Sequence, residues 1–148
     1  MSERGVTARQ KESLANQARW CCEYCRAPSR YSASPFSVEH IIPRARGGAT
    51  VNDNLAYACQ GCNSFKYTKT TATDPISNVE VPLFHPRRQR WSEHFAWNAD
   101  ATLIIGVTAT GRATVEALRL NRQELVNLRR VLFQMGEHPP AESSAQSP

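Results

Sequence analysis

The apolar positions near the start of this chain recur with the spacing of one helical face. Residues 7–10, Thr-Ala-Arg-Gln, have the pattern of a capping box, and the apolar side chains of Leu14 and Ala18 follow at that spacing. We therefore expect a helix that begins after Thr7 and runs toward Trp20. This helix should lead into the first pair of cysteines, Cys22 and Cys25.

Two short apolar runs follow in the middle of the chain. Residues 37–43 and residues 54–58 each predict a β-strand, and the Arg- and Gly-rich residues 44–48 predict a flexible loop between them. A short helix is expected over residues 63–67. Two strands and one helix of this size are too small to be stable alone, so the pattern requires a cross-link.

Beyond residue 70 the pattern predicts supporting structure. Residues 70–78, rich in Thr, Asp, Pro and Ser, predict a linker. The aromatic side chains of residues 82–97 predict a satellite core, which we favour over a surface that stacks nucleic-acid bases. Residues 103–107 predict a buried strand, and residues 121–124, Asn-Arg-Gln-Glu, predict a second capping box. The helix that follows has an apolar stripe, expected in the core rather than in a dimer seam, of Leu125, Leu128, Leu132 and Met135.

Length and composition limit the fold class. With 148 residues, 41% of them hydrophobic and 21% charged, the chain should form one core rather than a disordered or fibrous structure. We predict an α+β fold in which residues 1–70 hold a helix and a small strand–strand–helix unit. Residues 71–136 form an α/β extension packed on that unit, and residues 137–148 form a disordered tail. The apolar runs are too short to cross a membrane and no secretory signal is evident, so we expect a soluble cytoplasmic protein.

Cysteine spacing supplies the expected cross-link. Four of the five cysteines form two Cys-x-x-Cys pairs, Cys22 with Cys25 and Cys59 with Cys62. Two such turns provide the four thiolates of a structural zinc site, which we favour over redox pairing because one pair would suffice for redox chemistry. Cys21 is expected to be buried at the end of the first helix. The 33 residues between the pairs exceed the roughly 15–20 of simple zinc modules, so the two strands are inserted there.

The order of these elements resembles the HNH nucleases, whose core is a ββα-metal fold. The resemblance covers roughly residues 19–70. It rests on the first Cys pair, Glu-His-Ile-Ile-Pro at residues 39–43, Asn-Leu at residues 54–55, and Cys-x-x-Cys-Asn-x-x-Lys ending at residue 66. Strings in the extension, Leu-Phe-x-Pro-Arg and Gly-Arg-Ala-Thr, also resemble small stand-alone bacterial members. The resemblance implies a metal-dependent endonuclease that leaves a 5′-phosphate and a 3′-hydroxyl.

Specific residues take roles in this resemblance. His40 matches the first family histidine and Asn54 the middle asparagine, while Asn63 stands where the last histidine is usual, which makes the chain an H-N-N variant. Residue 39 is more often Asp and here is Glu39. Imidazole titrates near neutral pH, so His40 is the predicted general base, and Asn54 is suited to hold the loop backbone. Glu39 and Asn63 offer oxygen ligands for a catalytic Mg²⁺ or Mn²⁺.

The charge distribution agrees with a polyanionic partner. The net charge is +5, and the whole surplus falls within residues 1–70. We predict that Arg44, Arg46 and Lys66 contact nucleic acid, with double-stranded DNA favoured and both a monomer and a homodimer left open. The remaining histidines are predicted to be structural or exposed; they are His85, His94 and His138.

Two other functions remain compatible with the sequence. A zinc module that binds nucleic acid without cutting it would keep the cysteines and the basic loop, but it has no need for Glu39, His40 and Asn63. An interaction module for a protein partner would bind nucleic acid with a shallow salt dependence, because it makes few phosphate contacts.

Overall fold

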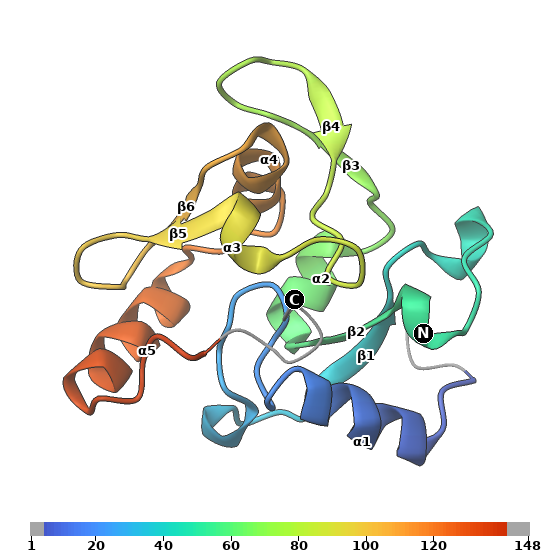
Figure 1. The fold of residues 1–148 in the computed structure, drawn as a ribbon, viewed down its shortest axis with the longest axis horizontal. Coiled ribbons are helices and arrows are strands. Elements are labelled where there is room, and N and C mark those ends of the chain that lie inside the picture. Colours follow the sequence, from blue (N-terminus) through green and yellow to red (C-terminus); the bar gives the residue numbers. More distant parts are fainter. Residues whose placement is uncertain (1–4, 142–148) are drawn as a thin grey trace.

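The computed structural model describes residues 5–141 and consists of separate helices and small antiparallel sheets (Figure 1). Within these residues the helices are α1 (Ala8–Gln17), α2 (Gln60–Lys66), α3 (Trp91–His94), α4 (Ala109–Ala117) and α5 (Gln123–Gln134). The strands are β1 (Ser37–His40), β2 (Leu55–Ala58), β3 (Thr71–Thr73), β4 (Glu80–Pro82), β5 (Phe95–Trp97) and β6 (Ile104–Gly106). They pair as β1–β2, β3–β4 and β5–β6, all antiparallel, so the predicted α+β class is confirmed.

Helix α1 begins as its sequence predicts. The Thr7 hydroxyl accepts a hydrogen bond from the Gln10 backbone N–H at 3.0 Å, and the Gln10 side chain accepts one from the Thr7 backbone N–H at 3.0 Å. The helix ends at Gln17, short of Trp20, because Arg19 and Trp20 adopt positive φ angles of 54° and 59°. These two residues turn the chain into the first cysteine pair.

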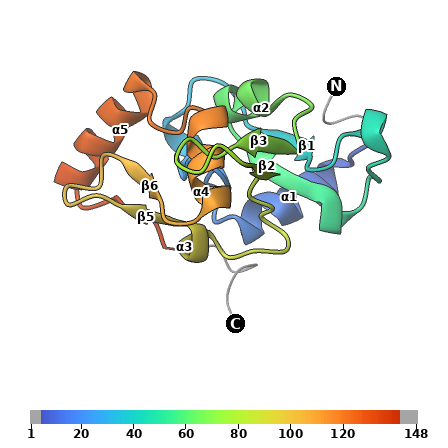
Figure 2. The ribbon, with the colours of Figure 1, turned by 90° about the horizontal axis from the view of Figure 1, so that it is seen from above.

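Strands β1 and β2 form the ribbon on which the site is built. Glu39 faces Ala56 across the ribbon and His40 faces Leu55. Alternate residues point to opposite faces, and Val38 packs with Leu14 of α1. Helix α2 lies on the other side of the ribbon from α1, as Figure 1 and the view from above in Figure 2 show.

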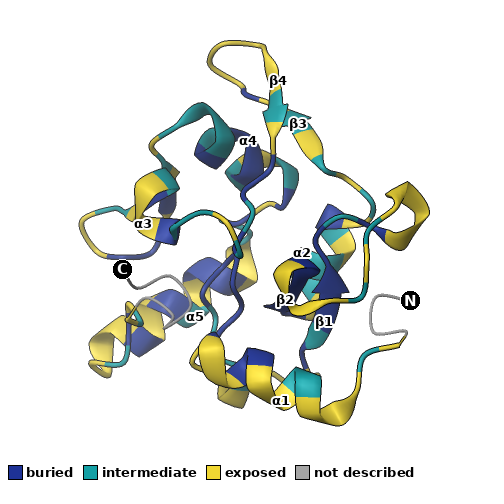
Figure 3. Ribbon diagram, turned by 45° about the vertical axis from the view of Figure 1, so that its right-hand side comes forward, coloured by how far each residue is buried: buried dark blue, intermediate teal, exposed yellow. Residues whose placement is uncertain are grey.

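The aromatic residues of the extension join the main core. The Trp91 indole N–H donates to the Tyr24 carbonyl at 3.1 Å, and the rings of Tyr24 and Phe84 meet edge to face with centroids 6.5 Å apart. These residues belong to one buried cluster with the four paired cysteines. Figure 3 colours the ribbon by burial and shows buried stretches in β1, α4 and α5. The predicted satellite core is therefore wrong, because Tyr24 and Trp91 connect the aromatic side chains to the cysteine turns.

The predicted linker at residues 70–78 contains a strand. Strand β3 pairs with β4 to form a hairpin that projects at the top of Figure 1. The Arg112 guanidinium of α4 donates two hydrogen bonds to the Asp74 carboxylate, at 2.8 and 2.9 Å. This pairing holds the pKa of Asp74 well below its usual range and fastens the hairpin to α4.

Strand β6 is only partly buried. Ile104 is buried, whereas Leu103, Ile105 and Val107 are exposed, so the buried strand predicted for residues 103–107 is half right. The predicted capping box at residues 121–124 is wrong. Helix α5 begins after Arg122, whose side chain makes no capping bond.

The Asn121 side chain has a different partner. It accepts from the backbone N–H of Ile104 at 2.8 Å and donates to its carbonyl at 2.9 Å. The Asn121 amide therefore supports strand β6 instead of capping α5. In the stripe predicted for α5, Leu125 and Leu132 are buried but Met135 is 54% exposed.

Helix α4 has no counterpart among the predicted elements. The Thr108 hydroxyl caps it by accepting from the Gly111 backbone N–H at 3.0 Å. A Cβ atom at Gly111 would overlap the carbonyl oxygen of His94, so glycine allows α4 to pack closely on the chain before β5. A glycine within a nine-residue helix weakens the sequence pattern that would reveal it.

The start of the predicted tail contacts the folded chain. His138 is buried, and its ring lies edge to face against Trp97 with centroids 4.5 Å apart. Residues 142–148 of the tail lie outside the described residues. Over residues 5–141, no helix combines the length and the apolar character needed to cross a membrane.

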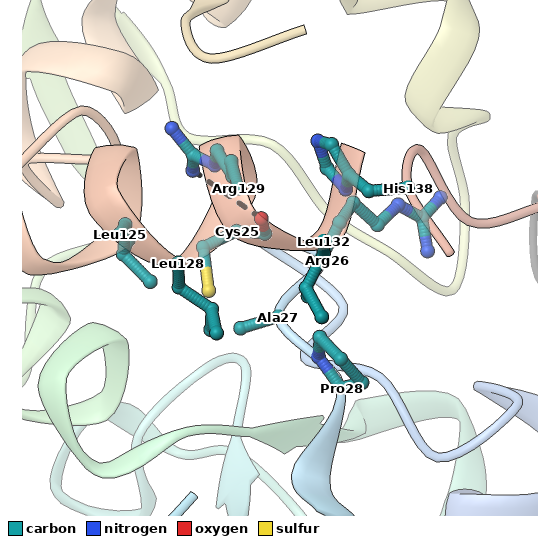
Figure 4. A pocket seen from close by; sticks show the side chains of 9 residues that line it. All are labelled: Cys25, Arg26, Ala27, Pro28, Leu125, Leu128, Arg129, Leu132 and His138. Carbon is teal, nitrogen blue, oxygen red and sulfur yellow. Dashed lines mark hydrogen bonds between the residues drawn. The ribbon is translucent and has the colours of Figure 1, made fainter. Parts of the chain in front are cut away.

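Arg129 of α5 joins the extension to the first cysteine turn. Its buried guanidinium donates to the carbonyls of Thr102, Leu120 and Cys25 at 3.0, 2.6 and 3.4 Å. Figure 4 shows the bond to Cys25, which lies with Arg129 in the wall of a small crevice. Carbonyl groups from three separate segments therefore depend on one side chain.

We predict that Arg129→Leu lowers the free energy of unfolding by about 3 kcal/mol, because buried carbonyls lose their donor. Urea unfolding of the zinc-loaded protein measures the change. Arg130→Ala, at the exposed neighbouring position, is the control and should stay within about 0.5 kcal/mol of wild type. Equal stability of the two variants would contradict the role of Arg129.

Candidate metal centre and functional site

The four paired cysteines come together in the core. The sulfur atoms of Cys22, Cys25, Cys59 and Cys62 all lie within 4.8 Å of one another, and all four residues are buried. The sulfur atoms of Cys25 and Cys59 are 3.7 Å apart. A tetrahedral zinc ion with Zn–S bonds of about 2.3 Å separates its sulfur ligands by about 3.8 Å, so the cluster fits this ion. Cys21 is buried but lies outside the cluster, as predicted.

Backbone N–H groups point at the sulfur atoms. The Cys22 sulfur accepts from the N–H groups of Tyr24 and Cys25, at 3.5 and 3.4 Å. The Cys59 sulfur accepts from the Cys62 N–H at 3.4 Å and serves as the N-cap of α2. These donors favour thiolates over thiols, which is the form that zinc binds.

A guanidinium group from the extension also contacts the cluster. Arg122 donates to the Cys59 sulfur at 3.4 Å and to the Cys62 sulfur at 3.7 Å. Burial lowers the pKa of Arg122, but the charges of the neighbouring thiolates outweigh this and leave it raised. Four thiolates around one Zn²⁺ carry a net charge of about −2, so Arg122 offsets part of it.

We predict that Arg122→Ala weakens zinc binding about tenfold, because the thiolates lose a charged hydrogen-bond donor. A chromogenic zinc chelator measures the rate of release and a competition titration the affinity. Arg119→Ala is the matched control, since Arg119 lies over the same Phe65 ring as Arg122. Of these two arginines, Arg122 donates hydrogen bonds to the cysteine sulfurs within residues 5–141 and Arg119 does not. Unchanged zinc release in Arg122→Ala would contradict the assignment.

Beside the metal centre, Glu39 lies in a buried ion pair. The Lys66 ammonium is 3.1 Å from the Glu39 carboxylate, and the two side chains are 1% and 2% exposed. The Tyr24 hydroxyl donates to the other carboxylate oxygen, and Lys66 also donates to the Ile41 carbonyl at 2.7 Å. Burial raises the pKa of Glu39, whereas the Lys66 charge and the Tyr24 hydrogen bond oppose the rise.

This pair changes the interpretation of Lys66. If Lys66 contacted a phosphate, its ammonium group would have to be exposed. The structure instead buries this group between β1 and α2. Such a contact requires the ion pair with Glu39 to open. The sequence could not show this, because 27 positions separate the two partners.

His40 lies on the face of β1 opposite Glu39. Its ring Nε2 is 2.8 Å from the Thr50 hydroxyl, and the residue is 5% exposed. This contact fixes the orientation of the imidazole. The structure therefore connects His40 to the loop after β1. Sequence reasoning did not identify Thr50, whose only signal was its place in that loop.

Asn54 holds the same loop closed. Its side chain accepts from the Ile42 N–H at 2.8 Å and donates to the carbonyls of Ile42 and Ala49 at 3.0 and 2.9 Å. A Cβ atom at Gly48 would overlap the Ile42 carbonyl oxygen, so only glycine fits beside this clamp. These contacts are the kind predicted for Asn54 from its donors and acceptor.

The remaining predicted residues lie around this core. Asn63 is half-buried in α2, three positions before Lys66 and hence on the same side of the helix. Arg44 and Arg46 are exposed in the loop after β1, and Arg46 also donates to the Thr68 carbonyl at 3.0 Å.

A second buried carboxylate supports the first cysteine turn. Glu23 accepts from the Tyr57 backbone N–H at 2.8 Å and forms an ion pair with Arg87 of the extension. Burial lowers the pKa of Arg87 to about 10. Sequence reasoning missed this pair. The available signal was the position of Glu23 and Tyr24 between Cys22 and Cys25 of the cluster.

We predict that Lys66→Met lowers the free energy of unfolding by about 3–5 kcal/mol, because Glu39 loses the cation that balances its buried charge. Urea unfolding at neutral pH measures the change. Lys69→Met, at an exposed position nearby, should have little effect. A Lys66→Met protein as stable as Lys69→Met would show that the ion pair is not essential.

Comparison with known families agrees with this geometry. Residues 22–69 match the family model described as HNH endonuclease. The matched segment runs from the first cysteine of the cluster to just beyond Lys66, and so includes β1, β2 and α2. Searches of curated proteins and of solved structures found no match.

Proposed function

We propose that this chain hydrolyses phosphodiester bonds in nucleic acid, because residues 22–69 match the HNH endonuclease family model and the four cysteines form a cluster that fits a zinc-binding variant. The observation that carries the proposal is His40, held by Thr50 at the end of β1 inside the matched segment. The family match supports a nuclease-type function in general. Residues 1–70 are the proposed nuclease core and residues 71–136 its extension.

His40 is the proposed general base. An imidazole accepts a proton from water near neutral pH, and a base positioned in this way accelerates a reaction by about 10²–10⁴-fold. The Thr50 hydroxyl fixes the ring, and Asn54 fixes the loop that carries Thr50 by binding the Ile42 and Ala49 backbones. Thr50 and Asn54 are thus positioning residues, and His40 is the group that takes the proton.

Glu39 and Asn63 are the residues that would hold a divalent ion. The chemistry of the donor set fits Mg²⁺ or Mn²⁺, since a carboxylate and an amide oxygen suit hard cations. The Lys66 ammonium already provides a positive charge at the Glu39 carboxylate, and a metal ion there would take its place. When bound, such an ion would offset the charge that develops on the phosphate.

Nucleic acid is the proposed substrate, with double-stranded DNA favoured. Arg44 and Arg46 extend from the loop between His40 and Thr50, so phosphate groups bound by these arginines would lie close to the base. Lys66 is left out of this set because it lies inside the protein. Hydrolysis would leave a 5′-phosphate and a 3′-hydroxyl, as the family resemblance implies.

We predict that His40→Ala lowers the rate of plasmid nicking by at least about 100-fold, because the reaction loses its base. Nicking is measured with added Mg²⁺ or Mn²⁺ and without either ion, on protein whose zinc content is verified. His94→Ala is a matched control, since its ring also bonds a threonine hydroxyl, that of Thr108, at 2.7 Å. It should retain wild-type activity.

In the same assay, Asn63→Ala should raise the concentration of divalent ion needed for half-maximal cleavage. Wild-type nicking by His40→Ala would show that another group is the base. Binding of DNA by the wild type without any cleavage would instead identify a zinc module that binds nucleic acid. An unchanged metal titration for Asn63→Ala would remove Asn63 from the set of ligands.

A further inference from the structure

A cavity of about 270 Å³ opens beside the Glu39–Lys66 pair, between the nuclease core and the extension. Its walls come from three segments of the chain. The lining includes Ile41, Lys66, Leu83, Phe84, His85 and Arg88. We propose that this cavity binds one nucleotide of the substrate strand next to the phosphodiester that is cut, with Arg88 and His85 contacting its phosphate. This inference rests on the proposed function.

The cavity adjoins the candidate site directly. Ile41 follows His40 in the chain, and its carbonyl accepts the hydrogen bond from Lys66 at 2.7 Å. His85 and Lys66 both line the cavity, although they come from separate segments of the chain. The cavity and the candidate site therefore share Lys66 and the segment that directly follows His40.

The charges of the lining suit an anion. The lining holds Lys66, His85 and Arg88 but no aspartate or glutamate. Two other cavities of the described part, each of at least 250 Å³, contain a carboxylate, Glu137 in one and Glu116 in the other. Since Glu39 balances Lys66, and none of the ion pairs formed within residues 5–141 involves Arg88, Arg88 supplies the unbalanced positive charge.

The turn at His85 presents a hydrogen-bond donor. The backbone N–H of Arg87 donates to Nδ1 of the His85 ring at 3.3 Å. An imidazole that accepts at Nδ1 carries its proton on Nε2, which can then donate to a phosphate oxygen. The turn is preformed, because the Gln89 side chain accepts from the His85 backbone N–H at 2.8 Å and the Gln89 N–H donates to the His85 carbonyl at 3.0 Å.

The rest of the cavity suits the sugar or the base. Ile41, Leu83 and Phe84 are buried apolar residues in its lining. A volume of about 270 Å³ lies at the lower limit of sites for small molecules, which begin at about 300 Å³, so the cavity has room for no more than about one nucleotide unit. Apolar walls with a few polar groups are typical of such sites.

The experiment compares Arg88→Ala, Arg88→Lys and His85→Ala with wild type. Fluorescence anisotropy of a short labelled DNA duplex gives the Kd over a series of salt concentrations, and cleavage of the same duplex gives kcat and KM. Arg130→Ala, at an exposed position on α5 outside the cavity lining, is the control. Zinc content and circular dichroism verify the fold of each variant.

We expect Arg88→Ala to raise Kd and KM about tenfold and to reduce the slope of log Kd against log salt by about 1, the loss of one phosphate contact. Arg88→Lys should restore the slope. His85→Ala should raise KM with kcat retained, because the cavity binds substrate away from the reacting atoms.

The two proposals fail in different ways. If the wild type cleaves DNA and the Arg88 and His85 variants match Arg130→Ala, the cavity does not bind the strand, and the proposed function stands. If the wild type neither binds nor cleaves DNA or RNA, both proposals are overturned. Arg88 is exposed, so its variants decide the question even where His85→Ala does not fold.

Discussion

Four buried sulfur atoms within 4.8 Å of one another are the constraint on which this structure depends. Four thiolates this close would repel one another strongly in the absence of a metal ion. A structural zinc ion bound by them would stabilise the folded state by a free energy on the order of 10 kcal/mol. The ion would join the turn after α1 to the start of α2, with the β1–β2 ribbon between them in sequence. Two arginines of the extension bind the cysteine turns: Arg122 donates to the Cys59 sulfur and Arg129 to the Cys25 carbonyl. The cysteine cluster and the extension therefore stabilise each other.

The candidate site depends on this centre through buried charges. Tyr24 lies between two of the cysteines, and its hydroxyl donates to Glu39, so the position of the zinc turn affects the carboxylate. Lys66 is in α2, the helix that the second cysteine pair begins, and balances the same carboxylate. A buried ion pair costs desolvation and contributes little net stability, but loss of one partner is expensive. The arrangement therefore holds Glu39 in one position rather than stabilising the fold.

The sequence predicted what local spacing determines. The cysteine pairs, the capping box of α1 and the two strands between the cysteines each depend on residues a few positions apart, and the structure has all of them. Other features depend on partners that are distant in sequence. Asn121 has the pattern of a cap, but its amide binds Ile104, and Lys66 has the pattern of a surface cation, but Glu39 holds it inside. Periodicity carries no information on such pairings.

The contacts between residues distant in sequence also determine which basic side chains are available to attract a polyanion. Several positive side chains are engaged inside the protein or in ion pairs, and they are Lys66, Arg87, Arg112, Arg122 and Arg129. Carboxylates or thiolates balance the first four of these charges, and Arg129 is buried against backbone carbonyls, so the five add little to the potential outside. Under the proposed function, attraction of a phosphate backbone depends on exposed cations, which include Arg44, Arg46 and Arg88 around the loop and the cavity. Because counterion release follows the phosphates that are contacted, the salt dependence of the proposed binding should reflect the exposed cations at the interface and not the net charge of +5.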